Sequence, residues 1–231
     1  MQRLRVRYAK RGRLRFTSHR DFSRAFERAV FRAQVPMAYS SGFNPHPRIS
    51  YAGAAPTGSA SEAEYLEIAL AAVLDPAVVH GQLEEALPDG LDVVEVVDAA
   101  LLPPGSLADL LTASRWVIDT AATPEAARAA VEAFLAEESV VVERMTKKGM
   151  REFDCRAAVA ALAVADAPHE GGGARLDLLL QHTVPAVRPD DVLTGLGRLT
   201  ALEVGPAPLL TRLQQGPLDE AAGTIGDPFA H

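Results

Sequence analysis

A segment rich in proline and glycine, spanning residues 39–65, constrains this chain more than any other stretch. It reads YSSGFNPHPRISYAGAAPTGSASEAEY and has no helical period. Proline fixes φ and biases the residue before it away from helix, so Asn44 and His46 are expected in extended backbone. The segment therefore predicts a stiff polar connection, a kind of loop that often carries function. The alternative is an irregular connection that binds nothing.

Positive charge is concentrated at the N-terminal end of the sequence. Residues 1–50 contain 12 Lys and Arg against two Asp and Glu, a net charge of +10, whereas the remainder contains 11 basic and 28 acidic residues, a net charge of −17. Such an asymmetry favours an anionic partner for the basic end, and nucleic acid is the most general one. The alternative is internal compensation, in which the basic end docks on the acidic remainder.

Composition excludes several classes of protein. The 231 residues, 48% of them apolar, suit one large domain or two of ordinary size, and the single Cys155 excludes an internal disulfide framework. No apolar run approaches the ~20 residues that span a bilayer, so a cytoplasmic protein without membrane association is expected. The sequence contains no HxxxH or CxxC pair and no glycine-rich nucleotide motif, and we therefore expect neither a metal nor a cofactor.

The first 98 residues predict the order strand, helix, strand, strand, helix, strand, provided that the central segment contains one short strand. Apolar residues alternate with arginines over residues 3–8, which indicates a strand. Ser18 and Asp21 form a helix start, and Phe22 and Phe26 begin the apolar face of that helix. Arginines recur at every fourth position beside this face: Arg20, Arg24, Arg28 and Arg32.

The predicted element order begins again after a Pro-Pro-Gly stretch. We therefore predict an α+β protein made of two tandem ferredoxin-like units with mostly antiparallel sheets. The predicted boundaries are a basic unit at 1–100, a linker at 101–106, a second unit at 107–204 and a flexible tail at 205–231. Within the second unit, Lys147 and Lys148 predict a hairpin turn, and residues 169–173 predict a flexible connection.

Several side chains near the basic end are candidates for chemistry or binding. Asp21 lies among arginines that would keep its carboxylate ionised, which makes it the weak candidate for a catalytic residue, although it also fits a helix cap. His19 and His46 are placed to share a ligand with Glu62 or Glu64. Aromatic residues close to the basic ones are candidates for stacking on RNA bases, or else belong to the core: Tyr39, Phe43 and Tyr51.

Four motifs give the sequence a resemblance to a known family. They are RFTSHRD at 15–21, GFNPHPRIS at 42–50, PxGxxSxxE at 56–64 and, less specifically, RPD at 188–190. Together they resemble the radical-SAM-linked family of unknown function, although Ala55 stands where that family favours leucine. The resemblance implies a stand-alone partner of a cobalamin-binding-type radical SAM protein, because the sequence lacks a CxxxCxxC cluster motif. It implies no catalytic residue.

The function hypothesis joins the charge pattern to this resemblance. We expect an accessory or substrate-presenting protein, without catalysis of its own, that works with a radical SAM enzyme and binds RNA or a ribonucleoprotein through its basic half. The alternatives are an RNA-modifying enzyme related to pseudouridine synthases, with Asp21 as nucleophile, and a protein-interaction module. The predicted ligand- or RNA-binding residues are Arg15, His19, Arg20, Arg24, Asn44, His46, Arg48 and Glu64.

Overall fold

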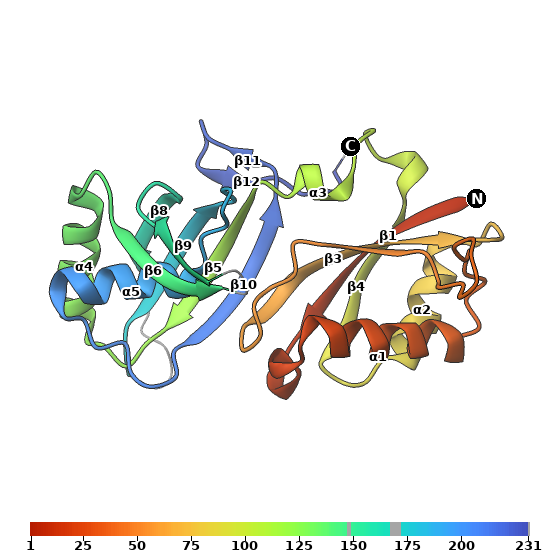
Figure 1. The fold of residues 1–231 in the computed structure, drawn as a ribbon, viewed down its shortest axis with the longest axis horizontal. Helices are drawn as coiled ribbons and strands as arrows, with labels where there is room; N and C mark the ends of the chain where they lie inside the picture. The colour runs from red at the N-terminus through yellow and green to blue at the C-terminus, as the bar shows by residue number, and fades with distance from the viewer. Residues whose placement is uncertain (147–148, 167–171, 231) are drawn as a thin grey trace. The chain divides into compact units, whose positions relative to one another are not determined.

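The computed structural model describes residues 1–146, 149–166 and 172–230, and the chain divides into two compact units. Unit 1 contains Met1–Leu111 together with the residues from Asp227 onward, and unit 2 contains Thr112–Gly226. Figure 1 shows helices and strands in both units, so the α+β class is confirmed. No helix of the described residues is long and apolar enough to cross a membrane.

Unit 1 contains a small antiparallel sheet. Its strands are β1 (Gln2–Lys10), β2 (Ile49–Ala52), β3 (Ala60–Leu70) and β4 (Leu91–Asp98). β1 lies between β3 and β4, and β2 pairs with β3. The short strand expected within the central segment is therefore β2, and it follows directly after the Asn-Pro-His-Pro-Arg run.

Two helices cover one face of this sheet: α1 (His19–Arg32) and α2 (Pro76–Ala86) (Figure 1). Their apolar faces and the alternate residues of the strands form one core, in which Phe26, Leu66 and Leu83 are fully buried. The predicted start of α1 is confirmed, because the Ser18 hydroxyl accepts a hydrogen bond from the Asp21 amide.

The opposite face of the unit 1 sheet is partly covered by the segment after β4. This segment contains the short helices η2 (Ala99–Leu101) and α3 (Leu107–Leu110). Leu102 and Leu107 are buried in a second cluster with Tyr65, and the Phe229 ring packs edge-on against the Tyr65 ring at a centroid distance of 5.4 Å. The stretch predicted as a linker at 101–106 thus packs against unit 1 through Leu102, whereas Leu101 is exposed.

Unit 2 repeats the alternation of strands and helices. Its main antiparallel sheet has the order β10 (Leu209–Gly216), β5 (Ala113–Asp119), β9 (Arg175–Gln181) and β8 (Val159–Val164). Its helices are α4 (Pro124–Ala136) and α5 (Pro189–Thr200), and its small ribbons pair β6 (Val141–Thr146) with β7 (Gly149–Asp154) and β11 (Leu218–Asp219) with β12 (Thr224–Ile225).

Part of the segment predicted as a flexible tail forms a strand of unit 2. The flexible tail predicted at 205–231 contains β10, in which Leu210 is buried and lies opposite Ile118 of β5. Glycines and prolines on both sides of this strand obscured its short apolar alternation. The turn expected at Lys147 and Lys148, and most of the flexible connection expected at 169–173, lie outside the described residues.

Candidate nucleic-acid interface

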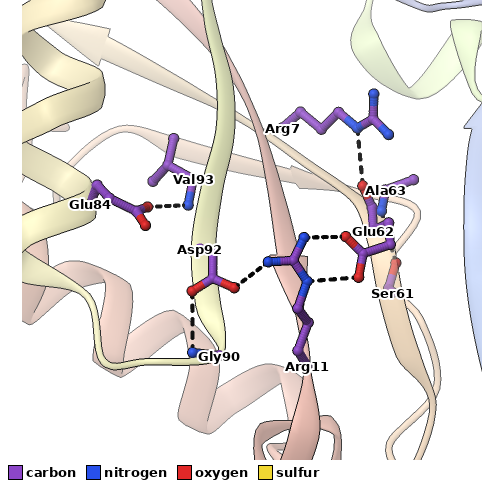
Figure 2. Close-up of polar contacts among 9 residues, drawn as sticks. All are labelled: Arg7, Arg11, Ser61, Glu62, Ala63, Glu84, Gly90, Asp92 and Val93. Carbon is purple, nitrogen blue, oxygen red and sulfur yellow. Dashed lines mark hydrogen bonds and ion pairs between the residues drawn. The ribbon is translucent and has the colours of Figure 1, made fainter.

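Three arginines near the start of the chain have carboxylate partners within unit 1. Arg3 and Arg5 both reach the carboxylate of Glu67, at 3.2 and 3.4 Å. Arg11 donates from Nε and Nη2 to the two oxygens of Glu62 and from Nη1 to Asp92, as Figure 2 shows. These carboxylates come from β3 and β4, so the compensation of charge is local to the unit.

The hydrogen bonds around Arg11 also have an electrostatic consequence. The Glu62 carboxylate, aided by Asp92, raises the pKa of the Arg11 guanidinium. Nearby, Arg7 donates from Nε to the backbone carbonyl of Glu62 at 3.0 Å (Figure 2). The basic outer face predicted for the first strand is therefore matched by acidic and carbonyl oxygens from its neighbouring strands.

The arginines of α1 lie in a different environment. All four are exposed, and none forms an ion pair with any residue that the structure describes: Arg20, Arg24, Arg28 and Arg32. Residues four positions apart lie on the same side of a helix, so the four arginines share the side of α1 that is not buried against the sheet. Phe31, on the same helix, is 81% exposed. We call these four arginines and Phe31 the α1 basic surface.

An open depression of about 720 Å³ adjoins this surface. It lies between the second half of α1 and the end of α2, and its wall contains Arg24, Arg28, Arg32 and Phe31 together with Glu27 and Pro88. Arginines and an exposed aromatic ring thus lie in the same wall. In proteins that bind single-stranded nucleic acid, such cations bind the phosphate backbone and such rings stack on bases.

Three of the sequence motifs meet at the start of α1. The Gly58 amide donates to the Arg15 carbonyl at 2.8 Å, which joins the motif at 56–64 to the motif at 15–21. The His19 ring packs edge-on against Tyr51, the residue after the motif at 42–50, with ring centroids 5.0 Å apart. Glu64 is 2% exposed, and its carboxylate accepts a hydrogen bond from the Ala55 amide at 3.2 Å. The acid therefore holds the loop before β3.

The remaining predicted residues lie in three places. Arg15 donates to the Gly12 carbonyl and lies over its neighbour Phe16, with 4.4 Å between the guanidinium carbon and the ring centroid. Asn44 is exposed in the loop before β2. His46 and Arg48 line a second groove, of about 320 Å³, together with residues of β1 and β3.

The loop before β2 is closed by Ser40. The Ser40 amide donates to the His46 carbonyl at 2.9 Å, and the Ser40 hydroxyl accepts from the His46 amide at 3.0 Å. Phe43, within the loop, is fully exposed, whereas Tyr51 is half-buried beside α1. Of the two rings, Phe43 is thus the one available for stacking.

The sequence was compared with protein families and with curated proteins. Residues 3–189 match the model of a family described as "Uncharacterized protein conserved in bacteria (DUF2344)". The chain belongs to this family. The DUF2344 match includes the motifs at 15–21, 42–50 and 56–64 and the first two residues of the motif at 188–190, and it extends from β1 to the first residue of α5. No curated protein matches the chain.

The acid nearest the start of α1 in this DUF2344 chain is used structurally. Ser18 donates its hydroxyl proton to Asp21 Oδ2 at 2.7 Å, while the same hydroxyl accepts from the Asp21 amide at 3.2 Å. This reciprocal arrangement closes the first turn of the helix. The observed contacts of Asp21 are those of a helix cap.

His, Cys, Asp and Glu are the side chains of this DUF2344 chain that could bind a metal, and Cys155 is its single thiol. No group of three or more His, Cys, Asp or Glu side chains is arranged to hold a metal ion within that part. Cys155 is completely buried in unit 2, where its Sγ donates to the Val140 carbonyl at 3.1 Å, and burial raises the pKa of its thiol to about 11. The thiol is therefore held neutral.

Sequence reasoning passed over Arg5 and Glu67 as members of a site. Arg5 and Glu67 lie on the face of the sheet opposite α1, where the alternation of Arg3, Arg5 and Arg7 places them. That alternation was the sequence signal that places Arg5 on this face. The strand pairing that places Glu67 opposite Arg5 and within reach of the Arg3 side chain could not be predicted from the sequence.

Proposed function

We propose that this chain binds single-stranded RNA, alone or in a ribonucleoprotein, through the α1 basic surface, as a non-catalytic partner that presents the RNA to a radical SAM enzyme. One observation supports the proposal that the chain binds RNA. The arginines at positions 3, 5 and 11 each have a carboxylate partner, whereas those at positions 20, 24, 28 and 32 have none among the described residues. An exposed, uncompensated row of guanidinium groups favours a polyanion.

RNA is a better fit than a rigid duplex because the surface combines charge with an exposed ring. Phe31 lies next to Arg28 and Arg32 in the wall of the same depression. Unpaired bases stack on such rings at about 1–3 kcal/mol per base, while arginines follow the phosphates. The exposed Phe43 and Asn44 of the loop before β2 provide a further contact of the same kind.

The radical SAM partner rests on the family resemblance of the motifs at 15–21, 42–50 and 56–64. We also infer that both units are ferredoxin-like. Counted along the chain, the four strands of unit 1 have the sheet order fourth, first, third, second. Strands β5, β8, β9 and β10 of unit 2 follow the same order, with the ribbon of β6 and β7 inserted after α4. This repeated order supports a duplication.

Direct titration with RNA tests the binding step. A double variant, Arg24→Ala with Arg28→Ala, is compared with Arg128→Ala with Arg151→Ala, which removes two exposed arginines from unit 2. Fluorescence anisotropy with a labelled, unstructured RNA is expected to give weaker binding for the first variant only. Its slope of log affinity against log salt should fall by about 0.7 for each phosphate that the variant no longer neutralises.

Equal RNA affinity of the two double variants would remove the proposal. Salt-sensitive binding to a protein with no binding to RNA would instead favour an interaction module. The partner step is tested by purifying the tagged chain from cells that express it at native level. Recovery of a radical SAM protein supports the partnership, and recovery of neither such a protein nor RNA overturns it.

A further inference from the structure

The face of the unit 1 sheet away from α1 contains a second cationic region. Leu4 and Val6 of β1 are buried beneath the helices, so Arg3 and Arg5 point to the other face. There the structure has a cavity of about 520 Å³, bounded by the start of β1, by Val73 and by residues 98–105. All of its walls belong to unit 1.

Among the residues that line this cavity, Arg5 is unusual because it is a charged residue that is almost completely buried. The residue is only 3% exposed, and two of its guanidinium nitrogens have acceptors: Nη2 donates to the Gly105 carbonyl at 2.6 Å and Nε to Glu67 at 3.4 Å. Nη1 is buried and has no hydrogen-bond acceptor among the described residues. Leaving a donor of a buried charged group unsatisfied is costly, so proteins seldom retain one without a reason.

The carboxylates nearby do not supply the missing acceptor. Glu67 is shared between Arg3 and Arg5, and its contact with Arg5 is long for a charge-assisted hydrogen bond. Asp98 is engaged elsewhere, because its two oxygens accept from the Gln2 side chain at 2.7 Å and from the Ala100 amide at 2.9 Å. Two guanidinium groups thus share one carboxylate at the edge of the cavity.

A neighbouring groove adds positive charge from the proline-rich loop. The groove lined by His46 and Arg48 shares Met1, Arg3 and Glu67 with the cavity. The Arg48 guanidinium donates from Nη1 to the Met1 sulfur at 3.9 Å, and a thioether sulfur is a weak acceptor. The Asn-Pro-His-Pro-Arg motif thus contributes a third arginine to the same region, and this arginine has no carboxylate partner among the described residues.

We propose that the cavity beside Arg5 binds a small molecule that carries an oxyanion, either a carboxylate or a phosphate. An oxygen of this group accepts from Arg5 Nη1, and the guanidinium groups of Arg3 and Arg48 provide further attraction. The remaining wall is largely apolar and suits a short hydrocarbon body: Val73, Ala99, Ala100, Pro103 and Pro104. Because Nη1 is buried, entry of the oxyanion requires a local movement of the atoms that cover this nitrogen.

This site is separate from the α1 basic surface. The two lie on opposite faces of one sheet and have no residue in common. A small-molecule ligand is therefore compatible with the RNA proposal and does not depend on it. Loss of RNA binding in the α1 variants leaves this inference intact, and absence of a small ligand leaves the RNA proposal intact.

Calorimetric titration with inorganic phosphate, and separately with succinate, tests the site in the full chain. We expect saturable binding of at least one of them. Arg5→Met should weaken it about tenfold to a hundredfold, the range expected when a hydrogen bond to a charged group is removed. Val73→Trp, which obstructs the mouth of the cavity from an exposed position, should weaken binding without touching Arg5. Arg128→Ala removes one exposed arginine from unit 2 and should change nothing.

The outcomes are distinct. Binding of phosphate alone identifies a phosphoester ligand, and binding of succinate alone identifies a carboxylate ligand. Binding of neither overturns the proposal, as does binding that survives both Arg5→Met and Val73→Trp. Thermal unfolding of each variant establishes whether it is folded. If Arg5→Met does not fold, the result with Val73→Trp decides the test.

Discussion

Arg11, the residue after β1, forms a bidentate ion pair with Glu62 of β3 (Figure 2). Nε of Arg11 lies 2.8 Å from one carboxylate oxygen, and Nη2 contacts the other. Nη1 extends the network to Asp92 of β4 at 2.6 Å, and Asp92 also accepts from the Gly90 amide at 3.2 Å. One guanidinium group therefore connects three neighbouring strands of unit 1.

The first prediction concerns this network. In a double-mutant cycle of Arg11→Ala and Glu62→Ala, we expect a coupling free energy of about 1 kcal/mol, because the pair is bidentate but the arginine side chain is 48% exposed. The coupling should shrink at about 1 M salt, where charges are screened beyond ~3 Å. Urea unfolding measures it, and Arg13→Ala, which removes an exposed arginine two residues away, is the control. Coupling unaffected by salt would contradict the electrostatic account.

The second prediction compares two glycines of α5. A Cβ at Gly195 would lie 2.8 Å from the Cys155 sulfur and 3.0 Å from a Val140 methyl group, whereas at Gly197 the nearest atom is 3.5 Å away. Gly195→Ala should therefore lower the free energy of unfolding by about 1–3 kcal/mol through overpacking. Gly197→Ala should raise it by up to about 1 kcal/mol, because alanine favours helix.

Chemical denaturation of both glycine variants provides the measurement, and each is the control for the other. Equal effects of the two substitutions would show that α5 does not pack as closely on its neighbours as the structure has it. Both substitutions change the packing of unit 2, since both glycines lie in one helix of that unit.

Local patterns were sufficient for much of unit 1. The spacing of Phe22 and Phe26 predicted the buried face of α1, and Ser18 predicted its first turn. Alternation over residues 3–8 predicted β1. These features depend on residues within a few positions of one another, which is the range over which helix and strand periods act.

The pairing of charges could not be predicted in the same way. Whether a given arginine is neutralised depends on strand register: Arg3 lies beside Ala69 and Arg5 beside Glu67, over more than 60 positions of sequence. The cavity at Arg5 likewise requires the segment at 98–105 to fold back on the sheet. The exposure of the α1 arginines, which have no ion-pair partner in the part of the chain that the structure describes, could be predicted because the four-residue spacing places them beside the apolar face of the helix.

The third prediction uses the single cysteine. Burial raises the pKa of Cys155 to about 11, while an unfolded thiol ionises at about 8.5. The folded state thus holds its proton more tightly, so this stabilising contribution is complete below pH ~8.5 and is lost as the pH rises towards ~11. At pH 8, iodoacetamide should modify the native chain far more slowly than the urea-unfolded chain. Rapid modification of the native thiol would contradict the buried position.

The last prediction separates a helix cap from a catalytic acid at the start of α1. Ser18→Ala should lower the free energy of unfolding by about 0.5–2 kcal/mol, since the Asp21 amide loses its acceptor. Asp21→Asn should cost less, because the amide oxygen still accepts from the Ser18 hydroxyl. Neither change alters the α1 arginines, so RNA affinity should stay within about twofold, an interaction change below ~0.5 kcal/mol. If Asp21→Asn instead abolished a base-modifying turnover while RNA affinity and stability were unchanged, the acid would be catalytic and the non-enzymatic role proposed for the chain would be wrong.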